Sequence, residues 1–145
     1  MPTKKVDGQT VEITQDEYDA MFPVPTLDEQ KAAKLAALAY KRWQVATGGI
    51  TVESLSVPTD DTTQLKATAA YVKATKDSDF SISSWKLPDG TFMALDNATI
   101  IAIGDAITDH IEACFDNEAT LTTAINAAAD QTALNAVDIT SGWPS

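Results

Sequence analysis

The feature that most constrains this sequence is a stretch from about Ala98 to Ala129 that contains no proline and a single glycine, Gly104. Asp96 or Asn97 can cap its start, because both side chains accept hydrogen bonds from the free N–H groups of a first helical turn. The stretch therefore predicts one long helix near the C-terminus, and the remaining elements of the chain must be arranged around it.

Apolar residues recur along this predicted helix at alternating spacings of four and three residues. The seam consists of Ile100, Gly104, Ile107, Ile111, Cys114, Glu118, Leu121, Ile125 and Ala128. Such a pattern is typical either of a coiled-coil contact or of the core face of a globular helix. Coiled-coil seams rarely contain both a glycine and a glutamate, so we favour the core face and keep self-association through this helix as the alternative.

Acidic residues dominate the second half of the chain. All ten Lys and Arg residues lie at or before Lys86, whereas residues 87–145 carry nine carboxylates. The formal net charge of the whole chain is −11. This surface argues against nucleic acid and anionic membranes as partners and leaves a basic protein open. Four carboxylates share one face of the long helix and are candidate partner-binding residues, although a solvated face is the simpler interpretation. They are Asp105, Asp109, Glu112 and Asp116.

His110 and Cys114 lie one helical turn apart, which is the spacing of half a zinc site. The chain has no second His or Cys, so only another copy could complete the coordination, and no intramolecular disulfide can form. The simpler interpretation is an unreactive, partly buried thiol beside a surface imidazole. The sequence contains no GxSxG, phosphate-loop or GxGxxG motif. We therefore expect no metal ion, no cofactor and no catalysis.

Residues 1–25 are predicted to form a separate N-terminal arm. Val11 and Ile13 alternate with polar residues, as in a short half-buried strand. Thr14 and Glu17 have capping-box spacing, which predicts a short helix over residues 15–21. The prolines of the FPVPT segment then form a linker at 23–25, since proline cannot donate a backbone hydrogen bond and disfavours helix in the residue before it. The main domain is expected to span residues 26–145.

A second long helix is predicted to follow Thr26, which has a capping partner in Glu29. Gly48 and Gly49 are expected to end it with a left-handed cap. Its apolar surface is wide, with Leu35, Leu38, Ala39 and Arg42 on one face and Ala36, Tyr40 and Trp43 in a neighbouring stripe. We expect Trp43 to pack in the core, because large apolar side chains in helices are usually buried.

The segment between the two long helices is predicted to contain a strand over residues 50–57, a helix and a hairpin. Thr59 is expected to cap this helix. Its apolar face comprises Leu65, Thr68, Ala69 and Val72. The hairpin is centred on the LPDG turn within residues 80–92, and a short helix is expected near residues 132–137.

These elements predict an α+β, mainly helical fold. It would have three helices, the longest of them C-terminal, a small antiparallel β element, and a short N-terminal strand–helix arm. The N-terminus lacks the apolar segment of a signal peptide, and no window approaches the roughly 18 apolar residues of a membrane span. We therefore expect a protein that is made in the cytoplasm and is neither exported by a signal peptide nor inserted in a membrane.

Several segments together resemble a known family. In order they are KAAKLAALAYKRWQVATGGITV, a helix after VPTDDTT, SISSWKLPDGTFMALDNATIIAIGDAITDHIEACF, and the terminal AVDITSGWP. They are similar to a family of small bacteriophage domains, classed as a domain of unknown function, that occurs in tail-fibre and tail-assembly gene neighbourhoods. The resemblance covers about residues 27–144 and leaves out the N-terminal arm.

The resemblance implies a phage protein that binds a tail-fibre or baseplate protein, as an assembly chaperone or as a lasting subunit. It would occur in the virion tail and, during assembly, in the host cytoplasm. The alternative is a structural virion component, a baseplate or tail-fibre segment that forms a homo-oligomer through its long helix. Trp143 and Pro144 are further candidate partner-binding residues, because a terminal Trp either folds back on the domain or anchors a partner.

Overall fold

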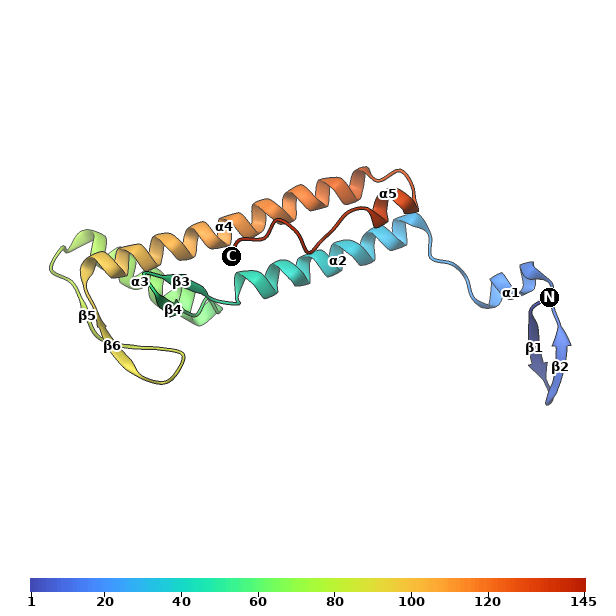
Figure 1. Ribbon diagram of the computed structural model, residues 1–145, viewed down its shortest axis with the longest axis horizontal. Helices are drawn as coiled ribbons and strands as arrows, with labels where there is room; N and C mark the ends of the chain where they lie inside the picture. Colours follow the sequence, from blue (N-terminus) through green and yellow to red (C-terminus); the bar gives the residue numbers. More distant parts are fainter.

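The computed structural model describes all 145 residues as an elongated molecule (Figure 1). Helices α2 (Leu27–Ala46) and α4 (Asn97–Ala127) lie side by side in antiparallel orientation and form the middle of the molecule. Helix α3 (Asp61–Lys76) packs on the first half of α4 at one end. The N-terminal arm projects beyond the opposite end, where α2 begins.

The strands form three separate two-stranded antiparallel sheets. Strands β1 (Thr3–Val6) and β2 (Gln9–Glu12) precede helix α1 (Gln15–Met21) in the arm. Strands β3 (Ile50–Val52) and β4 (Leu55–Val57) connect α2 to α3, and β5 (Ile82–Lys86) and β6 (Phe92–Leu95) connect α3 to α4. The short helix α5 (Gln131–Asn135) follows α4 and leads into an irregular C-terminal tail.

The predicted α+β, mainly helical class is confirmed, but the structure has five helices and not three. The two further helices are the short ones: α1 lies at the predicted residues 15–21, and α5 lies close to the helix expected near residues 132–137. Helix α4 is also not the only long helix, because α2 has 20 residues. The β structure is also more dispersed than one small element, because each hairpin packs or projects separately. The predicted single strand of the arm is one half of a hairpin, since β1 pairs with β2 over the turn at Asp7 and Gly8.

The helix starts follow the predicted capping residues with one exception. Both capping boxes are present: Thr14 caps α1 and Thr26 caps α2, each with its side chain bonded to the N–H of the Glu three residues later. Helix α3, however, is capped by Asp60 and not by Thr59. The Thr59 side chain is buried and accepts a hydrogen bond from the N–H of Gly49 at 2.9 Å, so it closes the corner after α2.

The predicted strand over residues 50–57 is a tight hairpin. Glu53 and Ser54 form its two-residue turn with φ of 50° and 69°. Both residues are in the left-handed region, which matches the twist of a two-residue hairpin but is unusual without Gly or Asn. The burial of Val52 and Val57 in the core holds both strands in place. Of the two glycines before the hairpin, only Gly49 has a positive φ, at 91°.

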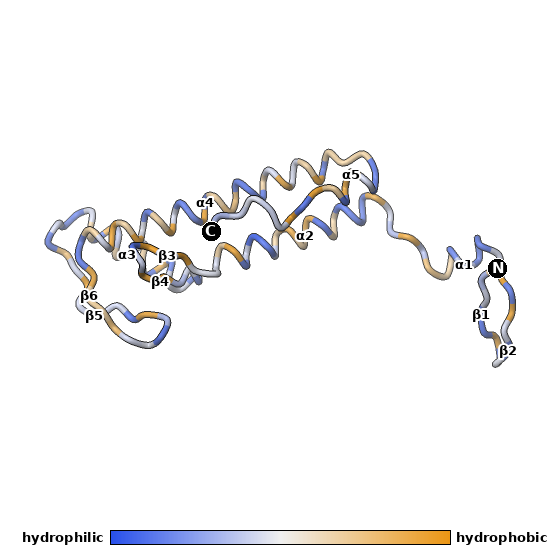
Figure 2. The backbone as a smooth tube through the Cα atoms, viewed as in Figure 1, coloured by the Kyte–Doolittle hydropathy of each residue, from blue (hydrophilic) through white to orange (hydrophobic).

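The core consists of two clusters that both use the seam of α4, so the prediction of a core face is confirmed. The first joins α4 to α3 and to the hairpins through Val52, Val57, Ala67, Ala74, Leu95, Ile100, Ile103 and Ile107. The second joins α4 to α2 and α5 through Leu38, Ile125, Ala128 and Leu134. Figure 2 shows apolar and polar residues alternating along α2 and α4, as expected for helices with one buried side.

The predicted apolar face of α3 is on the wrong side. Leu65 is 72% exposed and Val72 is also exposed, whereas Ala67 and Ala74 are buried. The small residues face inward because α3 packs closely on α4, where the ring of Tyr71 lies against Gly104. A side chain at Gly104 would overlap this ring, so the one glycine of the long helix provides space for Tyr71.

Candidate interaction surfaces

The four predicted carboxylates of α4 are all exposed, but they are not equivalent. Asp105 forms a hydrogen bond with the side chain of Tyr71, and this bond and the carboxylate charge raise the pKa of Tyr71. Asp109, Glu112 and Asp116 form no ion pair within the chain, because the one ion pair in the structure joins Arg42 to Glu118. These three carboxylates form an open acidic face that a basic partner could contact.

His110 and Cys114 lie together on α4 as predicted, but neither reaches the surface. The imidazole is 7% exposed and its Nε2 lies 2.9 Å from the carbonyl oxygen of Val45, to which it must donate. The Cys114 sulfur is completely buried, 4.0 Å from the same nitrogen, and burial raises the pKa of the thiol. The expected surface imidazole is therefore wrong: His110 joins α4 to the last turn of α2. No group of three or more His, Cys, Asp and Glu side chains is arranged to hold a metal ion.

Arg42 explains why the seam of α4 contains a glutamate. Its Nε lies 2.7 Å from a carboxylate oxygen of Glu118, and both side chains are about one quarter exposed. The guanidinium also lies 4.5 Å from the centre of the Phe115 ring, within the range of a cation–π contact. These interactions join α2 to α4 where their shared core is interrupted, so Arg42 and Glu118 have a structural role.

The C-terminal tail returns along the α2–α4 pair, as Figure 1 shows. The Trp143 ring is half-buried against the second core cluster, and its Nε1–H donates to the carbonyl of Ile139 at 2.8 Å. Asn117 of α4 donates to the carbonyl of Ser141 at 2.9 Å. Trp143 is thus folded back on the domain, while Pro144 is partly exposed beside Asp109.

The corner after α2 borders an open hollow of about 730 Å³. It is lined mainly by backbone and small side chains, among them Gly48, Gly49, Thr51, Pro58 and the C-terminal Ser145. No charged side chain lines this hollow, and only two of its ten lining residues are hydrophobic. The corner therefore ends α2 and turns the chain, and it lacks the apolar lining of a typical ligand pocket.

The prediction that Trp43 packs in the core is wrong. Its side chain is 50% exposed and stacks on Tyr40, which is 59% exposed, with ring centres 5.6 Å apart. The buried side of α2 is centred on Leu38, and Trp43 lies about 140° around the helix from it. The spacing of Ala36, Tyr40 and Trp43 identified the stripe correctly, but this stripe faces solvent.

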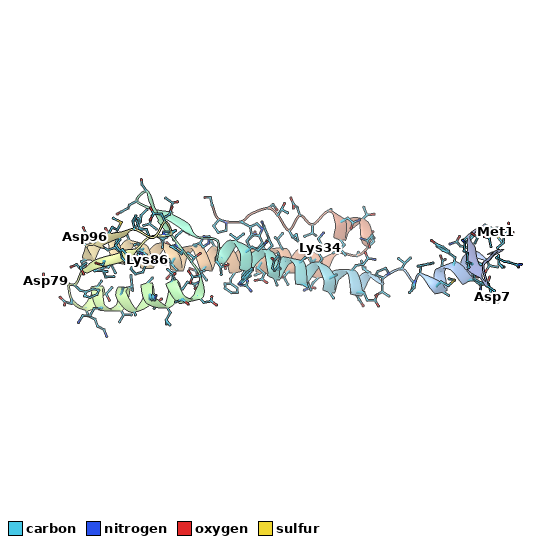
Figure 3. All side chains as sticks on the ribbon, turned by 90° about the horizontal axis from the view of Figure 1, so that it is seen from below. Met1, Asp7, Lys34, Asp79, Lys86 and Asp96 are labelled. Carbon is cyan, nitrogen blue, oxygen red and sulfur yellow. The ribbon has the colours of Figure 1, made fainter.

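The arm is a second exposed apolar surface that the sequence analysis did not identify. Ile13 is the one buried residue among the first 25. The exposed large apolar residues of this segment are Met1, Val6, Val11, Tyr18, Met21, Phe22 and Val24. Figures 1 and 3 both show the arm, with its helix α1, clear of helices α2, α3, α4 and α5, so the rest of the chain leaves these side chains uncovered. The sequence does not reveal that Val6 and Val11 are exposed, because the same alternation of apolar and polar residues is found in a half-buried strand.

No helix combines the length and the apolar character that a membrane crossing requires.

The comparisons with known proteins give a single match. Neither a curated protein nor a solved structure shows significant similarity to the chain. Residues 29–141, which include α2 from its third residue and all of α3, α4 and α5, match a family described as a domain of unknown function (DUF4376). The match covers most of the chain and leaves out the arm, and the protein therefore belongs to the DUF4376 family.

Proposed function

We propose that this DUF4376 protein is a bacteriophage tail-fibre-associated protein that acts by binding and not by catalysis. In this proposal its arm docks on a tail-fibre or baseplate protein, in the virion tail or in the host cytoplasm during assembly. The phage setting rests on the resemblance of sequence segments within residues 27–144 to small phage domains. The observation that carries the binding role is the projecting arm, whose large apolar side chains, apart from Ile13, are exposed.

The arm has little stability of its own. It consists of one two-stranded sheet and the seven-residue helix α1, and an isolated hairpin of this kind is at best marginally stable in water. Only Ile13 is buried, and its N–H donates to the carbonyl of Pro2 at 3.0 Å. A partner that covers the arm would therefore stabilise it and order it at the same time.

The chemistry of the arm suits a protein partner. Tyr18 and Phe22 form a ring pair with centres 5.1 Å apart, and Met21 and Val24 lie beside them in sequence, all exposed. Complete burial of one such side chain contributes about 1.5–3 kcal/mol, so a few of them can anchor a complex. The outer edges of β1 and β2 are also unpaired, and such edges can accept a strand from a partner.

The alternative is a baseplate or tail-fibre segment that self-associates through its long helix. The seam that suggested this alternative already contacts α2, α3 and α5 within the chain. Self-association through α4 would have to use its acidic outer face, where like charges repel. We therefore favour docking through the arm.

Co-expression with the tail-fibre protein encoded beside this gene tests the proposal. We expect the full chain to increase the amount of soluble fibre and to co-purify with it. The double variant Phe22→Ser, Val24→Ser should lose most of this co-purification, because both side chains are exposed in the arm, at 60% and 78%. A lasting subunit would remain in purified fibres, whereas a chaperone would be absent from them.

Phe92→Ser is a matched control. Phe92 is 63% exposed on β6, at the end of the molecule opposite the arm, so its loss should leave fibre binding unchanged. The proposal is contradicted if the unaltered chain neither solubilises the fibre nor co-purifies with it. Equal loss of binding in the Phe92 variant would show that the arm is not the docking element.

A further inference from the structure

Helix α2 presents a continuous uncharged face to solvent. This surface, called here the α2 outer face, consists of Ala32, Ala33, Ala36, Ala37, Tyr40, Trp43 and Gln44, all of them exposed. The stacked rings of Tyr40 and Trp43 occupy its C-terminal half, and the alanines occupy its N-terminal half. Figure 3 shows the molecule from below, with no other helix or strand drawn across this side of α2.

Three of the four cations of α2 lie against the rest of the domain, whereas its two exposed carboxylates, Asp28 and Glu29, are confined to the first turn, before the α2 outer face begins. Lys31 donates to the carbonyl of Asn126 at 3.0 Å, and Lys34 donates to the carbonyl of Leu134 at 2.6 Å. Arg42 is paired with Glu118. These cations are partly buried against α4 and α5, while apolar side chains face water. A surface helix normally has the reverse arrangement, so the α2 outer face has the composition of a covered surface.

We infer that the α2 outer face is a dimer interface, and that its occupant is the same face of a second copy packed antiparallel. The order of side chains along α2 carries this inference. When two copies cross at the level of Leu38, Trp43 of each copy faces Ala33 of the other, and Tyr40 faces Ala36. Each bulky ring then lies over a small residue, which a two-fold symmetric contact requires and a parallel arrangement does not provide.

Electrostatics also favour contact through this side. Helix α2 carries four cations and two carboxylates, whereas α4 carries five carboxylates and no cation. Two copies that meet through α2 therefore keep their most acidic surfaces apart, and the repulsion expected from a charge of −11 on each chain is smallest. Antiparallel helices also place the positive end of each helix dipole beside the negative end of the other.

The available area is sufficient for a small stable interface. The 20-residue helix α2 is about 30 Å long, which allows contact over five or so turns. Tyr40 and Trp43 of the two copies give four aromatic side chains, each about half exposed. A whole aromatic side chain has about 150–250 Å² of surface, so the four exposed halves would bury about 400 Å². The alanines and flanking residues would supply the rest of the roughly 1,000 Å² that a specific interface needs.

The mass of the purified full chain in solution tests this inference. Sedimentation or light scattering over a concentration series should give twice the 15.4 kDa of one chain at micromolar and higher concentrations. Ala36→Glu should raise the dimer dissociation constant at least about a hundredfold, because it places two unpaired carboxylates in the interface. Its helical circular dichroism should be unchanged, since Ala36 is exposed in the monomer.

Leu65→Glu is the matched control, because Leu65 is 72% exposed on α3, outside the α2 outer face. It should leave the dimer intact. A monomer at all concentrations of the unaltered chain overturns the inference, and so does a dimer that survives Ala36→Glu.

Orientation is tested with cysteine pairs, since the native Cys114 is buried. A mixture of Ala33→Cys and Trp43→Cys chains should form the mixed disulfide, whereas Ala33→Cys alone should not cross-link. Cross-linking of Ala33→Cys with itself would overturn the antiparallel arrangement. The dimer does not depend on the proposed function, and Ala36→Glu leaves the arm unaltered, so failure of one proposal is distinguishable from failure of the other.

Discussion

Gly104 is the residue at which the packing of α3 on α4 is tightest. A Cβ atom there would lie 2.8 Å from Cγ and 2.9 Å from Cβ of Tyr71, and the latter atom cannot move without the backbone. Gly104→Ala improves helix propensity by about 1 kcal/mol, but overpacking of this kind costs about 1–3 kcal/mol. We expect a net loss of about 1 kcal/mol in the free energy of unfolding, measured with urea.

A double variant provides the control for this prediction. Tyr71→Ala removes the ring that the new methyl group would meet. When Tyr71→Ala is already present, Gly104→Ala should leave the free energy of unfolding unchanged or increase it. The double-mutant cycle of these two substitutions measures the interaction energy between positions 71 and 104. If Gly104→Ala destabilises equally in both backgrounds, the Tyr71 ring is not the cause.

Tyr71 should also report its contact with Asp105 in an alkaline titration. The Asp105 hydrogen bond raises the pKa of Tyr71, so folding favours the neutral phenol. This contribution to stability is complete below the ordinary tyrosine pKa of about 10 and is lost as the pH rises through the raised value. Tyrosinate absorbance should show one of the three tyrosines ionising late.

The late step should move to lower pH in Asp105→Asn and be missing in Tyr71→Phe. Asp109→Asn changes the next exposed carboxylate of α4 and should leave the step unchanged. A late step that persists in Tyr71→Phe would assign it to another tyrosine.

At the scale of helices and strands, the elements that the sequence predicts well are those set by local contacts. Thr14, Thr26 and Asp96 cap their helices through bonds to residues three positions later, and this spacing is visible in the sequence. The LPDG turn likewise places β5 beside β6. These elements need no knowledge of distant partners.

The errors concern residues whose positions are set by distant contacts. Trp43 faces solvent because contacts with α4 decide which side of α2 is buried. Lys31 and Arg42 bond to residues of α4 that are 95 and 76 positions later in the sequence. Thr59 does not cap α3 because it bonds to Gly49 ten residues earlier. The turn at Glu53 and Ser54 has no Gly or Asn to indicate it, and the burial of the flanking valines holds it.

The caps of α3 and α4 predict part of the acid sensitivity of the fold. Hydrogen bonds from Thr63 and Thr99 lower the pKa of Asp60 and Asp96 respectively. Their contribution is therefore present above the ordinary Asp pKa of about 4 and is lost as the pH falls through the lowered values. The double variant Asp60→Asn, Asp96→Asn keeps a good capping residue at both positions but has no carboxylate there to protonate. Its thermal unfolding midpoint should therefore fall less steeply than that of the unaltered chain as the pH is lowered.

Asp116→Asn serves as the comparison for this prediction, because Asp116 is exposed in the middle of α4 and caps no helix. Its acid profile should match that of the unaltered chain. An unchanged slope in the double variant would mean that other carboxylates govern acid unfolding.

At the scale of the whole molecule, the linker between arm and body should be the first site of proteolysis. Residues 22–26 are all exposed and contain two prolines, and they lie between α1 and α2 outside regular structure. Mild digestion with a protease of broad specificity should release a fragment that begins near Thr26 and keeps the helical signal. Mass spectrometry identifies the cut, and first cleavage within the β5–β6 loop would contradict this division of the chain.

The position of the arm at the start of α2 has a consequence for the proposed dimer. Antiparallel packing sends the two arms to opposite ends of the particle, which makes it bivalent. Once one arm is attached, the other samples neighbouring sites at a high effective concentration. Modest affinity in each arm then becomes strong avidity for any target that repeats along an assembly, while isolated target chains are held only weakly.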